Sequence, residues 1–381
     1  MKKFYGDFTL GIIGGGQLGR MLIQSAIDFN IDVHVLDPSD HAPCKDVAHQ
    51  FTRGSLTDFD TVYRFGQDCD LITIEIENVN TEALKKLRDM GKQVWPQPEV
   101  IELVQDKVVQ KKFYRDNGIP TSPFYEVQSR EDVINHIDFV PMVNKLAREG
   151  YDGRGVQLIR RPEEISKAFD KPGLLEKLID FEREISVIVA RNVRGETASF
   201  PPVELAFHPE ANLVEFLFSP ASLKEDIDQK ARKIALTVIE KLKMTGLLAV
   251  EMFVTREGEV LVNEIAPRPH NSGHQTIESN VTSQYEQHLR AILDLPLGDT
   301  GMIIPSAMVN LLGEEGHSGD VYIEGMEKVM AVAGTHVHLY GKKETKPFRK
   351  MGHVTITDND MDSLRKKANF VKENLKIKTN G

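Results

Sequence analysis

The sequence has 381 residues, of which 27% are charged and 40% hydrophobic, and its 57 Asp and Glu against 47 Lys and Arg give a formal net charge of -10. This length fits two or three globular domains, and the composition excludes a largely disordered chain. The negative charge excludes general binding to nucleic acid or to an anionic membrane surface, so an anionic ligand must meet a local cluster of basic residues.

Two cysteines, Cys44 and Cys69, are too few for a disulfide framework and form no C-x-x-C pair for zinc or redox chemistry. The N-terminus has no apolar signal-peptide core, and no apolar run reaches the 18 residues that a membrane-spanning helix needs. We therefore expect a cytoplasmic protein without a membrane span.

Strand and helix patterns alternate over about the first 96 residues. Residues 9–16 form a predicted buried strand that runs into a glycine turn, and residues 17–30 have the apolar spacing of a helix. Further β-rich runs follow at 31–36, 70–76 and 93–95. This alternation predicts a parallel sheet covered by helices, and the prolines after residue 95 mark its end.

The glycine turn has more than one interpretation. Residues 14–19, Gly-Gly-Gly-Gln-Leu-Gly, fit the G-x-G-x-x-G pattern, and Asp37 ends the next strand, which is typical of an NAD(P)- or FAD-binding fold. Glycines before a helix N-terminus also suit any phosphate or carboxylate, because the backbone amides there are unpaired and accessible. A turn with only a structural role is the third interpretation. We favour a phosphate-bearing substrate.

The chain beyond residue 98 divides into two further regions. A charged helix is predicted over 99–117 and an amphipathic helix over 226–242, with strands at 173–178, 184–190, 247–254 and 260–265. After residue 298 the pattern changes to short strands and turns, with one terminal helix at about 360–375. We therefore expect three domains, at residues 1–98, 99–295 and 296–381.

The last two central strands predict a hairpin with a turn at residues 255–259. Pairing of Arg256 with Glu259 places Glu251 directly opposite Glu264. Opposed carboxylates have Cβ atoms about 4.5–5.5 Å apart and repel each other, which a bound cation would relieve. Oxygen ligands favour Mg²⁺ or Mn²⁺ over zinc, with water and substrate phosphates completing the shell. The alternatives are two solvated glutamates or a register shifted by one residue.

A second glycine-rich segment follows Lys145, which lies on a predicted strand. Residues 149–156 hold three glycines around a basic tip. Glycines let backbone amides approach phosphates while the lysine supplies a point charge, so we predict a phosphate-binding loop. A surface hairpin without a ligand is the alternative.

Two polar segments lie farther along the chain. Residues 266–274, Ala-Pro-Arg-Pro-His-Asn-Ser-Gly-His, imitate a zinc-binding helix through His270 and His274, but the glycine and prolines favour a loop that suits an oxygen-rich ligand. Five basic residues then fall between Lys342 and Lys350 against the single acid Glu344. This cluster is either a solvated loop or the local basic cluster that an anionic ligand needs.

Five motifs together resemble the ATP-grasp superfamily and, within it, the N5-carboxyaminoimidazole ribonucleotide synthetases of purine biosynthesis. They lie at 14–20, 150–155, 181–187, 263–274 and 349–353, so the resemblance extends over essentially the whole chain. It implies a fold of mixed α/β and α+β class, with an N-terminal Rossmann-like domain, a central ATP-grasp domain and a small C-terminal β-rich domain. It also implies a homodimer.

The resemblance implies residue roles around ATP. Lys107 and Lys145 would contact the phosphates. The loop expected to close over them comprises Gly150, Tyr151, Asp152, Gly153, Arg154, Gly155 and Val156. Adenine and ribose would lie against Glu176, Lys177, Leu178, Ile179, Glu184 and His208. Asn263 and Glu264, together with Glu251, would hold ATP and Mg²⁺, whereas Ala266 replaces a third metal ligand found in many ATP-grasp enzymes.

The resemblance also implies a side that receives aminoimidazole ribonucleotide and bicarbonate. Its expected residues are Gly16, Gln17, Leu18, Glu77, Arg268, Asn271, Ser272, Lys342, Arg349 and Lys350. Tyr151, Asp152, Arg268 and His270 are expected nearest to the reacting groups.

The implied reaction is phosphorylation of bicarbonate by ATP to carboxyphosphate, which then carboxylates the exocyclic amine of the ribonucleotide. Arg268 would stabilise the transferred group. Three competing hypotheses are a formate-using glycinamide ribonucleotide transformylase with the same Pro-Arg-Pro-His stretch, an NAD(P)-dependent oxidoreductase, and a nucleotide-binding sensor without turnover.

Overall fold

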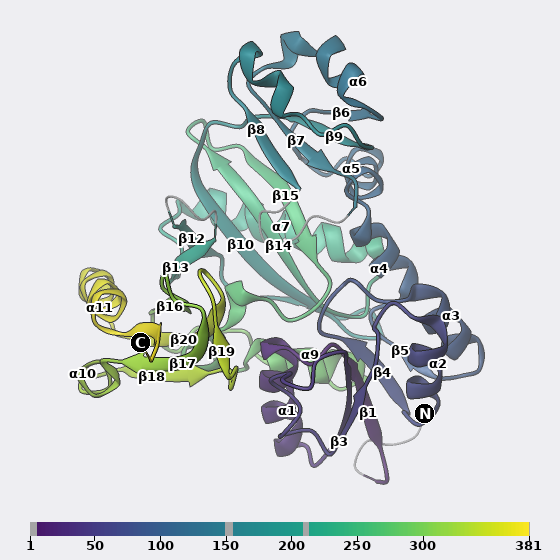
Figure 1. The fold of residues 1–381 in the computed structure, drawn as a ribbon, viewed down its shortest axis with the longest axis vertical. Helices are drawn as coiled ribbons and strands as arrows, with labels where there is room; N and C mark the ends of the chain where they lie inside the picture. The colour runs from purple at the N-terminus through teal and green to yellow at the C-terminus, as the bar shows by residue number, and fades with distance from the viewer. Residues whose placement is uncertain (1–5, 149–154, 209–212, 381) are drawn as a thin grey trace.

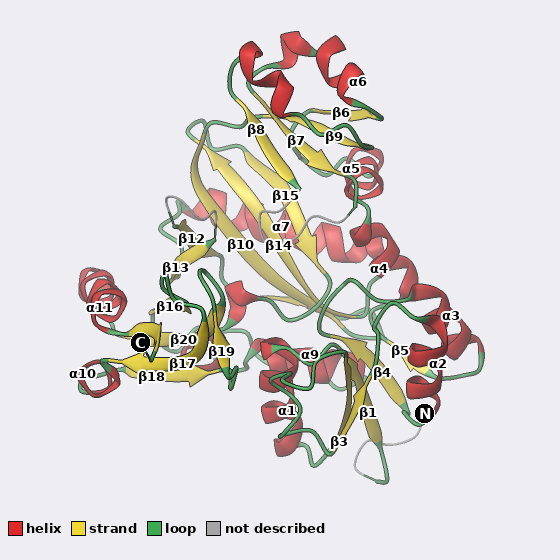
Figure 2. Cartoon of the chain, in the orientation of Figure 1, coloured by secondary structure: helices red, strands yellow, loops and turns green. Residues whose placement is uncertain are grey.

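The computed structural model describes residues 6–148, 155–208 and 213–380. Figure 1 shows a small sheet with its helices at one end of the molecule, a long central sheet, and two lobes at the other end that contain the N-terminal and C-terminal segments. Helices and strands are mixed throughout, which confirms the predicted fold class (Figure 2). Among the described helices, none is long and apolar enough to cross a membrane.

The N-terminal segment forms a sheet of five described strands, all parallel, in the order β3-β2-β1-β4-β5. The strands are β1 (Thr9–Ile13), β2 (Asp32–Asp37), β3 (Gln50–Arg53), β4 (Leu71–Ile74) and β5 (Gln93–Val94). β1 and β4 are almost completely buried, as continuous apolar runs are when helices cover both faces of a parallel sheet. The predicted Rossmann-like sheet is confirmed.

Helices from two distant parts of the sequence cover this sheet. On one face, α1 (Gln17–Asp28) packs beside α9 (Gln284–Ile292), whose Tyr285 and Leu289 enter the same core. On the other face lie α2 (Phe59–Gln67) and α3 (Thr81–Asp89). Residues far beyond position 98 therefore complete the N-terminal core.

The predicted single helix over 99–117 is wrong. The structure has two helices, α4 (Pro98–Gln105) and α5 (Lys107–Asp116), which are separated by Asp106 in an extended conformation. The Asp106 carboxylate accepts the backbone N–H groups of Val108 and Val109 at 3.0 and 3.2 Å. Because aspartate is a strong N-cap, its side chain starts a new helix where the apolar spacing alone suggested continuation.

The small sheet at the far end is antiparallel, with the described order β6-β9-β7-β8. Its strands are β6 (Phe124–Val127), β7 (Met142–Leu146), β8 (Val156–Ile159) and β9 (Gly173–Lys177). The helix α6 (Arg130–Asn135) and the 3₁₀ turns Ile137–Phe139 and Pro162–Lys167 accompany it. Val127, Val133, Met142, Ile159 and Leu175 form its core, so one face is apolar while the other remains available to line a cavity.

The long sheet has the described order β15-β14-β10-β12-β13-β16-β20-β18, and β11 also pairs with β10. Its first part contains β10 (Phe181–Arg191), β11 (Thr197–Ser199), β12 (Val203–Phe207), β13 (Val214–Ser219), β14 (Gly246–Thr255) and β15 (Val260–Ala266). The predicted amphipathic helix, α7 (Glu225–Leu242), buries Ala231, Ile234, Ala235, Val238 and Ile239 against this part. Period-3.6 apolar spacing therefore identified the helix and its packed face correctly.

Strands from the C-terminal segment continue the same long sheet. They are β16 (Ser306–Leu312), β18 (Thr335–Leu339) and β20 (Lys350–Thr357), and α11 (Met361–Asn374) packs on them. A separate small sheet joins β19 (Glu344–Thr345), β17 (Gly319–Glu324) and β21 (Lys376–Thr379), beside α10 (Met326–Met330). One sheet thus crosses the predicted boundary at residue 296, and the three-domain division stays a prediction.

Candidate active site

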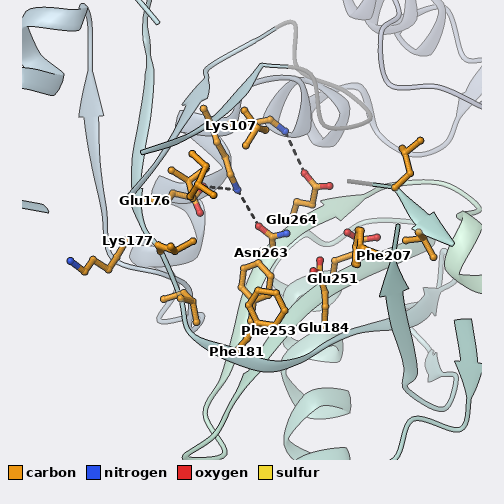
Figure 3. Close-up of a pocket in the computed structure, with 18 of the residues that line it drawn as sticks. Lys107, Glu176, Lys177, Phe181, Glu184, Phe207, Glu251, Phe253, Asn263 and Glu264 are labelled. Atoms are coloured by element: carbon orange, nitrogen blue, oxygen red, sulfur yellow. Dashed lines mark hydrogen bonds and ion pairs between the residues drawn. The ribbon is translucent and has the colours of Figure 1, made fainter. Parts of the chain in front are cut away.

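A cavity of about 650 Å³ lies between the small sheet and the hairpin end of the long sheet (Figure 3). Side chains from β7, β8 and β9 line one wall, and side chains from β10, β14 and β15 line the other. Of the residues predicted from the sequence, those that line it are Lys107, Lys145, Val156, Glu176, Lys177, Leu178, Ile179, Glu184, Glu251, Asn263, Glu264, His270, Asn271 and Lys350. One cavity therefore gathers residues separated by up to 243 positions in the chain, from Lys107 to Lys350.

The hairpin β14–β15 places Glu251 directly opposite Glu264, as predicted. The predicted tip register is wrong, because Thr255 N–H donates to the Glu259 carbonyl at 2.9 Å and Arg256 therefore does not pair with Glu259. A β-bulge between the two registers leaves Asn263 as an extra residue and restores the glutamate pair. The bulge explains why adjacent residues, Asn263 and Glu264, both line the cavity.

The two glutamates differ in their electrostatic surroundings. Burial raises the pKa of Glu251 well above its ordinary value, and the carboxylates of Glu264 and Glu184 raise it further. Lys107, whose Nζ lies 3.4 Å from Glu264 Oε2, holds the pKa of Glu264 below its ordinary value. The repulsion at Glu251 is the strain that a divalent cation between the two carboxylates would relieve.

The carboxylates of Glu251 and Glu264 could supply only part of the coordination shell of Mg²⁺, and a bound substrate would supply the rest. Among the described residues, no group of three or more His, Cys, Asp and Glu side chains is arranged to hold a metal ion. Glu251 and Glu264 supply two carboxylates, and Mg²⁺ normally completes its shell with water and substrate phosphates when protein ligands are few. The arrangement therefore suits a metal that enters together with a nucleotide.

Two lysines and one glutamate form a charge network beside the hairpin, which we call the lysine network; Lys111 and Glu176 are buried and Lys145 is partly buried. Glu176 Oε1 lies 3.1 Å from Lys145 Nζ, and its Oε2 lies 3.2 Å from Lys111 Nζ. Burial raises the pKa of Glu176, but Lys145 and Lys111 outweigh it and bring this pKa to about 2. Lys145 also donates to Asn263 Oδ1 at 3.1 Å, which links the network to the hairpin (Figure 3). The network holds a cationic ammonium at the cavity wall.

Lys111 was missed from the sequence. Its side chain is only 3% exposed and donates to Ser122 Oγ at 3.0 Å and to Thr121 Oγ1 at 2.6 Å. Burial lowers its pKa to about 8, so at neutral pH the lysine still carries a proton. No local motif marks this lysine, because its partners are Thr121 and Ser122, about ten residues later, and Glu176 on β9.

An apolar slot completes this end of the cavity. The rings of Phe181 and Phe253 stack with centroids 4.7 Å apart, and the segment Glu176–Ile179 lies alongside (Figure 3). The ammonium of Lys177 donates to the Phe139 carbonyl at 3.0 Å and points away from the other labelled side chains, so Lys177 faces the cavity mainly through its backbone and stem. Such a slot suits a planar heterocycle next to a polar edge.

His270 and Asn271, from the loop after β15, line the opposite end of the cavity, whereas the nearby Arg268, Ser272 and Glu77 are not part of its lining. Arg268 Nε lies 2.9 Å from Glu77 Oε1, which brings two predicted substrate residues together across 191 positions. Burial lowers the pKa of His270 well below its ordinary value, and nearby Arg268 and Lys350 lower it further, so its imidazole is neutral. Its Nδ1 lies 2.9 Å from the buried Ser272 hydroxyl.

Comparisons with known proteins agree with this geometry. The chain matches the family models of the ribonucleotide synthetase preATP-grasp domain over residues 8–105, of the ATP-grasp domain over 112–285, and of the phosphoribosylaminoimidazole carboxylase C-terminal domain over 306–367. It is 39% identical to the N5-carboxyaminoimidazole ribonucleotide synthase of Synechococcus elongatus, with 91% of this chain and 89% of that protein covered. The chain belongs to the N5-carboxyaminoimidazole ribonucleotide synthase family.

Solved structures of the family show the same fold. The synthetase from Thermotoga maritima is 41% identical with a TM-score of 0.90, and the match covers 98% of this chain and 100% of that one. The Aspergillus clavatus synthase, solved in complex with ADP and 5-aminoimidazole ribonucleotide, is 31% identical with a TM-score of 0.88 over 97% of this chain and 98% of that one. The chain spans 65% and 66% of the longer phosphoribosylaminoimidazole carboxylases of Vigna aconitifolia and Saccharomyces cerevisiae. The predicted superfamily and fold are confirmed.

Two amides of the glycine turn are paired with carboxylates of the N-terminal segment. Gly15 N–H donates to Asp37 Oδ2 at 2.8 Å and Leu18 N–H donates to Glu75 Oε1 at 3.1 Å. Gly16 and Gln17 lie in the same turn, which is not part of the lining of the cavity described above. Glu75 was missed from the sequence. Burial raises its pKa to about 7, and nearby Arg268 opposes that shift.

Several predicted residues lie away from the cavity lining or outside the described chain. His208 packs edge-on against Phe348 at 5.6 Å, and its backbone N–H donates to the Leu213 carbonyl at 2.8 Å. Lys342 donates to the Lys350 carbonyl at 2.6 Å, and Arg349 donates to the Glu344 carbonyl at 2.8 Å. Gly155 directly precedes β8. The residues that fall outside the described part are Gly150, Tyr151, Asp152, Gly153 and Arg154.

Proposed function

We propose that this chain catalyses the ATP- and bicarbonate-dependent carboxylation of 5-aminoimidazole ribonucleotide to N5-carboxyaminoimidazole ribonucleotide, with release of ADP and phosphate. The observation that carries the proposal is the single cavity that joins an apolar slot, the lysine network and the opposed Glu251 and Glu264 to the polar loop of His270 and Asn271. Family membership supports the same activity.

ATP would bind beside the stacked rings of Phe181 and Phe253 and against the segment Glu176–Ile179, with its phosphates toward Lys145 and Lys107. Glu251 and Glu264 would hold Mg²⁺, or Mn²⁺, which when bound neutralises charge on the β- and γ-phosphates. Lys145 is already protonated before ATP binds. Burial lowers its pKa, but Glu176 and Glu264 outweigh this effect and hold the pKa above its ordinary value. The protein thus provides fixed positive charge where the phosphates must lie.

The reaction would proceed in two bond-forming steps. A bicarbonate oxygen attacks the γ-phosphorus of ATP, and ADP leaves, which gives carboxyphosphate. The exocyclic amine of the ribonucleotide then attacks the carboxyl carbon, the carbon–oxygen bond to phosphate breaks, and the nitrogen loses a proton. Arg268 would stabilise the transferred group, and neutral His270 could accept that proton. Closure against water matters, because water would hydrolyse carboxyphosphate.

The test is ADP release with each substrate omitted in turn. We expect release to require both bicarbonate and 5-aminoimidazole ribonucleotide, with formate unable to replace bicarbonate. Release supported by formate and glycinamide ribonucleotide would favour the transformylase, and ATP binding without ADP release under any condition would favour a sensor.

Three further proposals accompany this function. We propose that the chain acts as a homodimer, that it works in the cytoplasm, and that residues 1–98, 99–295 and 296–381 are its domains. Sedimentation equilibrium tests the first, localisation of a fluorescent fusion tests the second, and the fragments released by limited proteolysis test the third.

A further inference from the structure

Three strands of the C-terminal segment carry polar side chains in one row across the long sheet. In the strand register, Asn310 of β16 pairs with His353 of β20, and His353 pairs with His338 of β18. We call Asn310, His353 and His338 the polar row. Directly paired residues project from the same face of a sheet, so the row presents its side chains together. Figure 1 shows these three strands side by side in the C-terminal lobe.

Each member of the polar row contacts one residue of the segment that follows the cavity loop. Asn310 and Asn271 exchange two hydrogen bonds, both of 2.9 Å. The rings of His353 and His274 stack with centroids 4.6 Å apart. The third contact joins His338 Nε2 to Glu278 Oε1 at 2.7 Å.

The partner residues repeat at helical spacing. Asn271, His274 and Glu278 are three and four positions apart. Asn271 begins a 3₁₀ turn (Asn271–Gly273), His274 follows that turn, and Glu278 lies in the short helix α8 (Thr276–Ser279). Side chains at this spacing lie on one face of a helical segment. Each residue on this face of the helical segment therefore contacts one residue of the polar row.

The contacts are buried and largely uncharged. Asn310 is 5% exposed, and His274 and His353 are fully buried. Burial lowers the pKa of both histidines well below the ordinary value, so their stacked rings are neutral. Tyrosine hydroxyls further orient them, with Tyr285 3.0 Å from His274 Nδ1 and Tyr340 3.0 Å from His353 Nδ1. These buried contacts favour one arrangement of the groups they join, although Nε2 of His274 and Nε2 of His353 have no hydrogen-bond partner among the described residues.

We propose that Asn310, His353 and His338 are positioning residues that set the end of the cavity where 5-aminoimidazole ribonucleotide is expected to bind. Asn271 and the preceding residue, His270, line the cavity, and Asn310 is hydrogen-bonded to Asn271. Lys350 also lines the cavity, and it is the first residue of β20, the strand that carries His353. The row thus fixes the distance between the loop and the first residue of β20. None of its three members lines the cavity itself.

This inference rests on the proposed function and predicts a selective defect. A displaced wall would weaken binding of the ribonucleotide, since misplacement by about 1 Å can change rates by about a hundredfold. The nucleotide end would be unaffected, because the lysine network and the aromatic slot belong to other elements. A role in overall stability alone would change both substrates together or neither.

The partly exposed His338 offers the safest variants. We expect His338→Phe, which removes the bond to Glu278, to raise KM for 5-aminoimidazole ribonucleotide about tenfold while KM for ATP changes less than about twofold. His338→Gln keeps a side-chain N–H donor and should restore most of the lost affinity. His336→Phe is the matched control, because His336 is exposed on the same strand, two residues away, and should behave as the wild type.

Asn310→Leu provides a second measurement, because it removes the reciprocal amide bonds to Asn271 at similar volume. A folded His338→Phe or Asn310→Leu protein with unchanged KM for the ribonucleotide, or with equal increases for both substrates, would overturn the inference. Wild-type ADP release that ignores 5-aminoimidazole ribonucleotide would overturn the proposed function as well, so the two failures are distinguishable.

Discussion

The two ends of the cavity are held in place by different forces. At one end, the lysine network joins Lys111 and Lys145 to Glu176 through contacts of 3.1–3.2 Å. At the other end, the polar row meets its partners through an amide pair and a stack of neutral histidines, and only its outer contact joins His338 to a carboxylate. Charge dominates the lysine network, whereas directional neutral contacts dominate the polar row.

This difference matches what each end must do. A triphosphate carries several negative charges, so fixed ammonium groups are useful even if the ligand shifts slightly. A small ribonucleotide whose amine must meet a carboxyl carbon needs a defined orientation more than it needs net charge. The comparison therefore predicts which substitutions change affinity through charge and which change it through geometry.

The largest expected effect is at the carboxylate pair. Glu264→Gln keeps the shape of the side chain but removes one of two metal-binding charges, and we expect ADP release to fall by about a thousandfold. Steady-state assays over a range of Mg²⁺ concentrations measure this. Glu259→Gln, in the exposed turn of the same hairpin, should retain wild-type activity. Near-normal activity of Glu264→Gln would contradict the metal assignment.

The next effect tests whether the lysine network is a buried unit. Lys111→Met leaves Glu176 paired only with Lys145, and loss of one partner of a buried ion pair costs about 3–5 kcal/mol. Urea unfolding measures this change. Lys112→Met is the control, because Lys112 is 41% exposed and its pair with Glu126 should contribute less than about 1 kcal/mol.

A double substitution sharpens the same test. Each single substitution already breaks the pair of Lys111 and Glu176, so Lys111→Met combined with Glu176→Gln should lose less stability than the sum of the two single losses. If the effects of the two substitutions simply add, Lys111 and Glu176 are not coupled, and the account of the network given above is wrong.

The two ends also differ in how far they could be predicted from sequence. The pair Glu251 and Glu264 follows from local hairpin pairing, although the bulge at Asn263 compensated for a wrong tip register. Lys145 was found because it precedes a glycine-rich segment. Lys111 carries no such signal, because Glu176 reaches it from 65 positions away.

At the other end, the decisive information is the order of distant strands. The loop residues Arg268, His270 and Asn271 were predicted, but Asn310 and His338 meet the loop only because β16, β20 and β18 are neighbours in one sheet. Strand neighbours of that kind depend on long-range pairing that a single sequence does not reveal. The partners of the glycine turn escaped sequence analysis for the same reason, since Asp37 and Glu75 reach its amides from other parts of the N-terminal sheet.

A smaller effect concerns pH and the buried histidines. Burial lowers the pKa of His288 to about 3, and it also lowers the pKa values of His274 and His353. Unfolded histidine binds a proton near pH 6.5 whereas these folded rings do not, so the free energy of unfolding should fall as pH drops below about 6.5. The loss approaches about 1.4 kcal/mol per pH unit for each such histidine.

Thermal unfolding at pH 7.5 and 5.5 measures that dependence. His288→Gln should reduce it, because glutamine does not titrate while it can still bond Thr73, which lies 3.0 Å from the histidine ring. His336→Gln, at an exposed position, should leave the dependence unchanged. Equal slopes in the wild type and in His288→Gln would show that the buried ring does not govern acid stability.

The smallest expected effect concerns Asp106, which separates α4 from α5 and directly precedes Lys107 in the cavity wall. Asp106 caps α5 and also lies 3.1 Å from Arg148 Nε, while Lys107 N–H donates to the Ala147 carbonyl at 2.8 Å. Asp106→Ala should cost about 1 kcal/mol of stability, and Asp106→Asn should cost less because asparagine also caps. If the cap also positions Lys107, Asp106→Ala should raise KM for ATP and leave KM for 5-aminoimidazole ribonucleotide unchanged, the reverse of the pattern expected for His338→Phe. Identical patterns in these two variants would mean that the two ends of the cavity are not independently held.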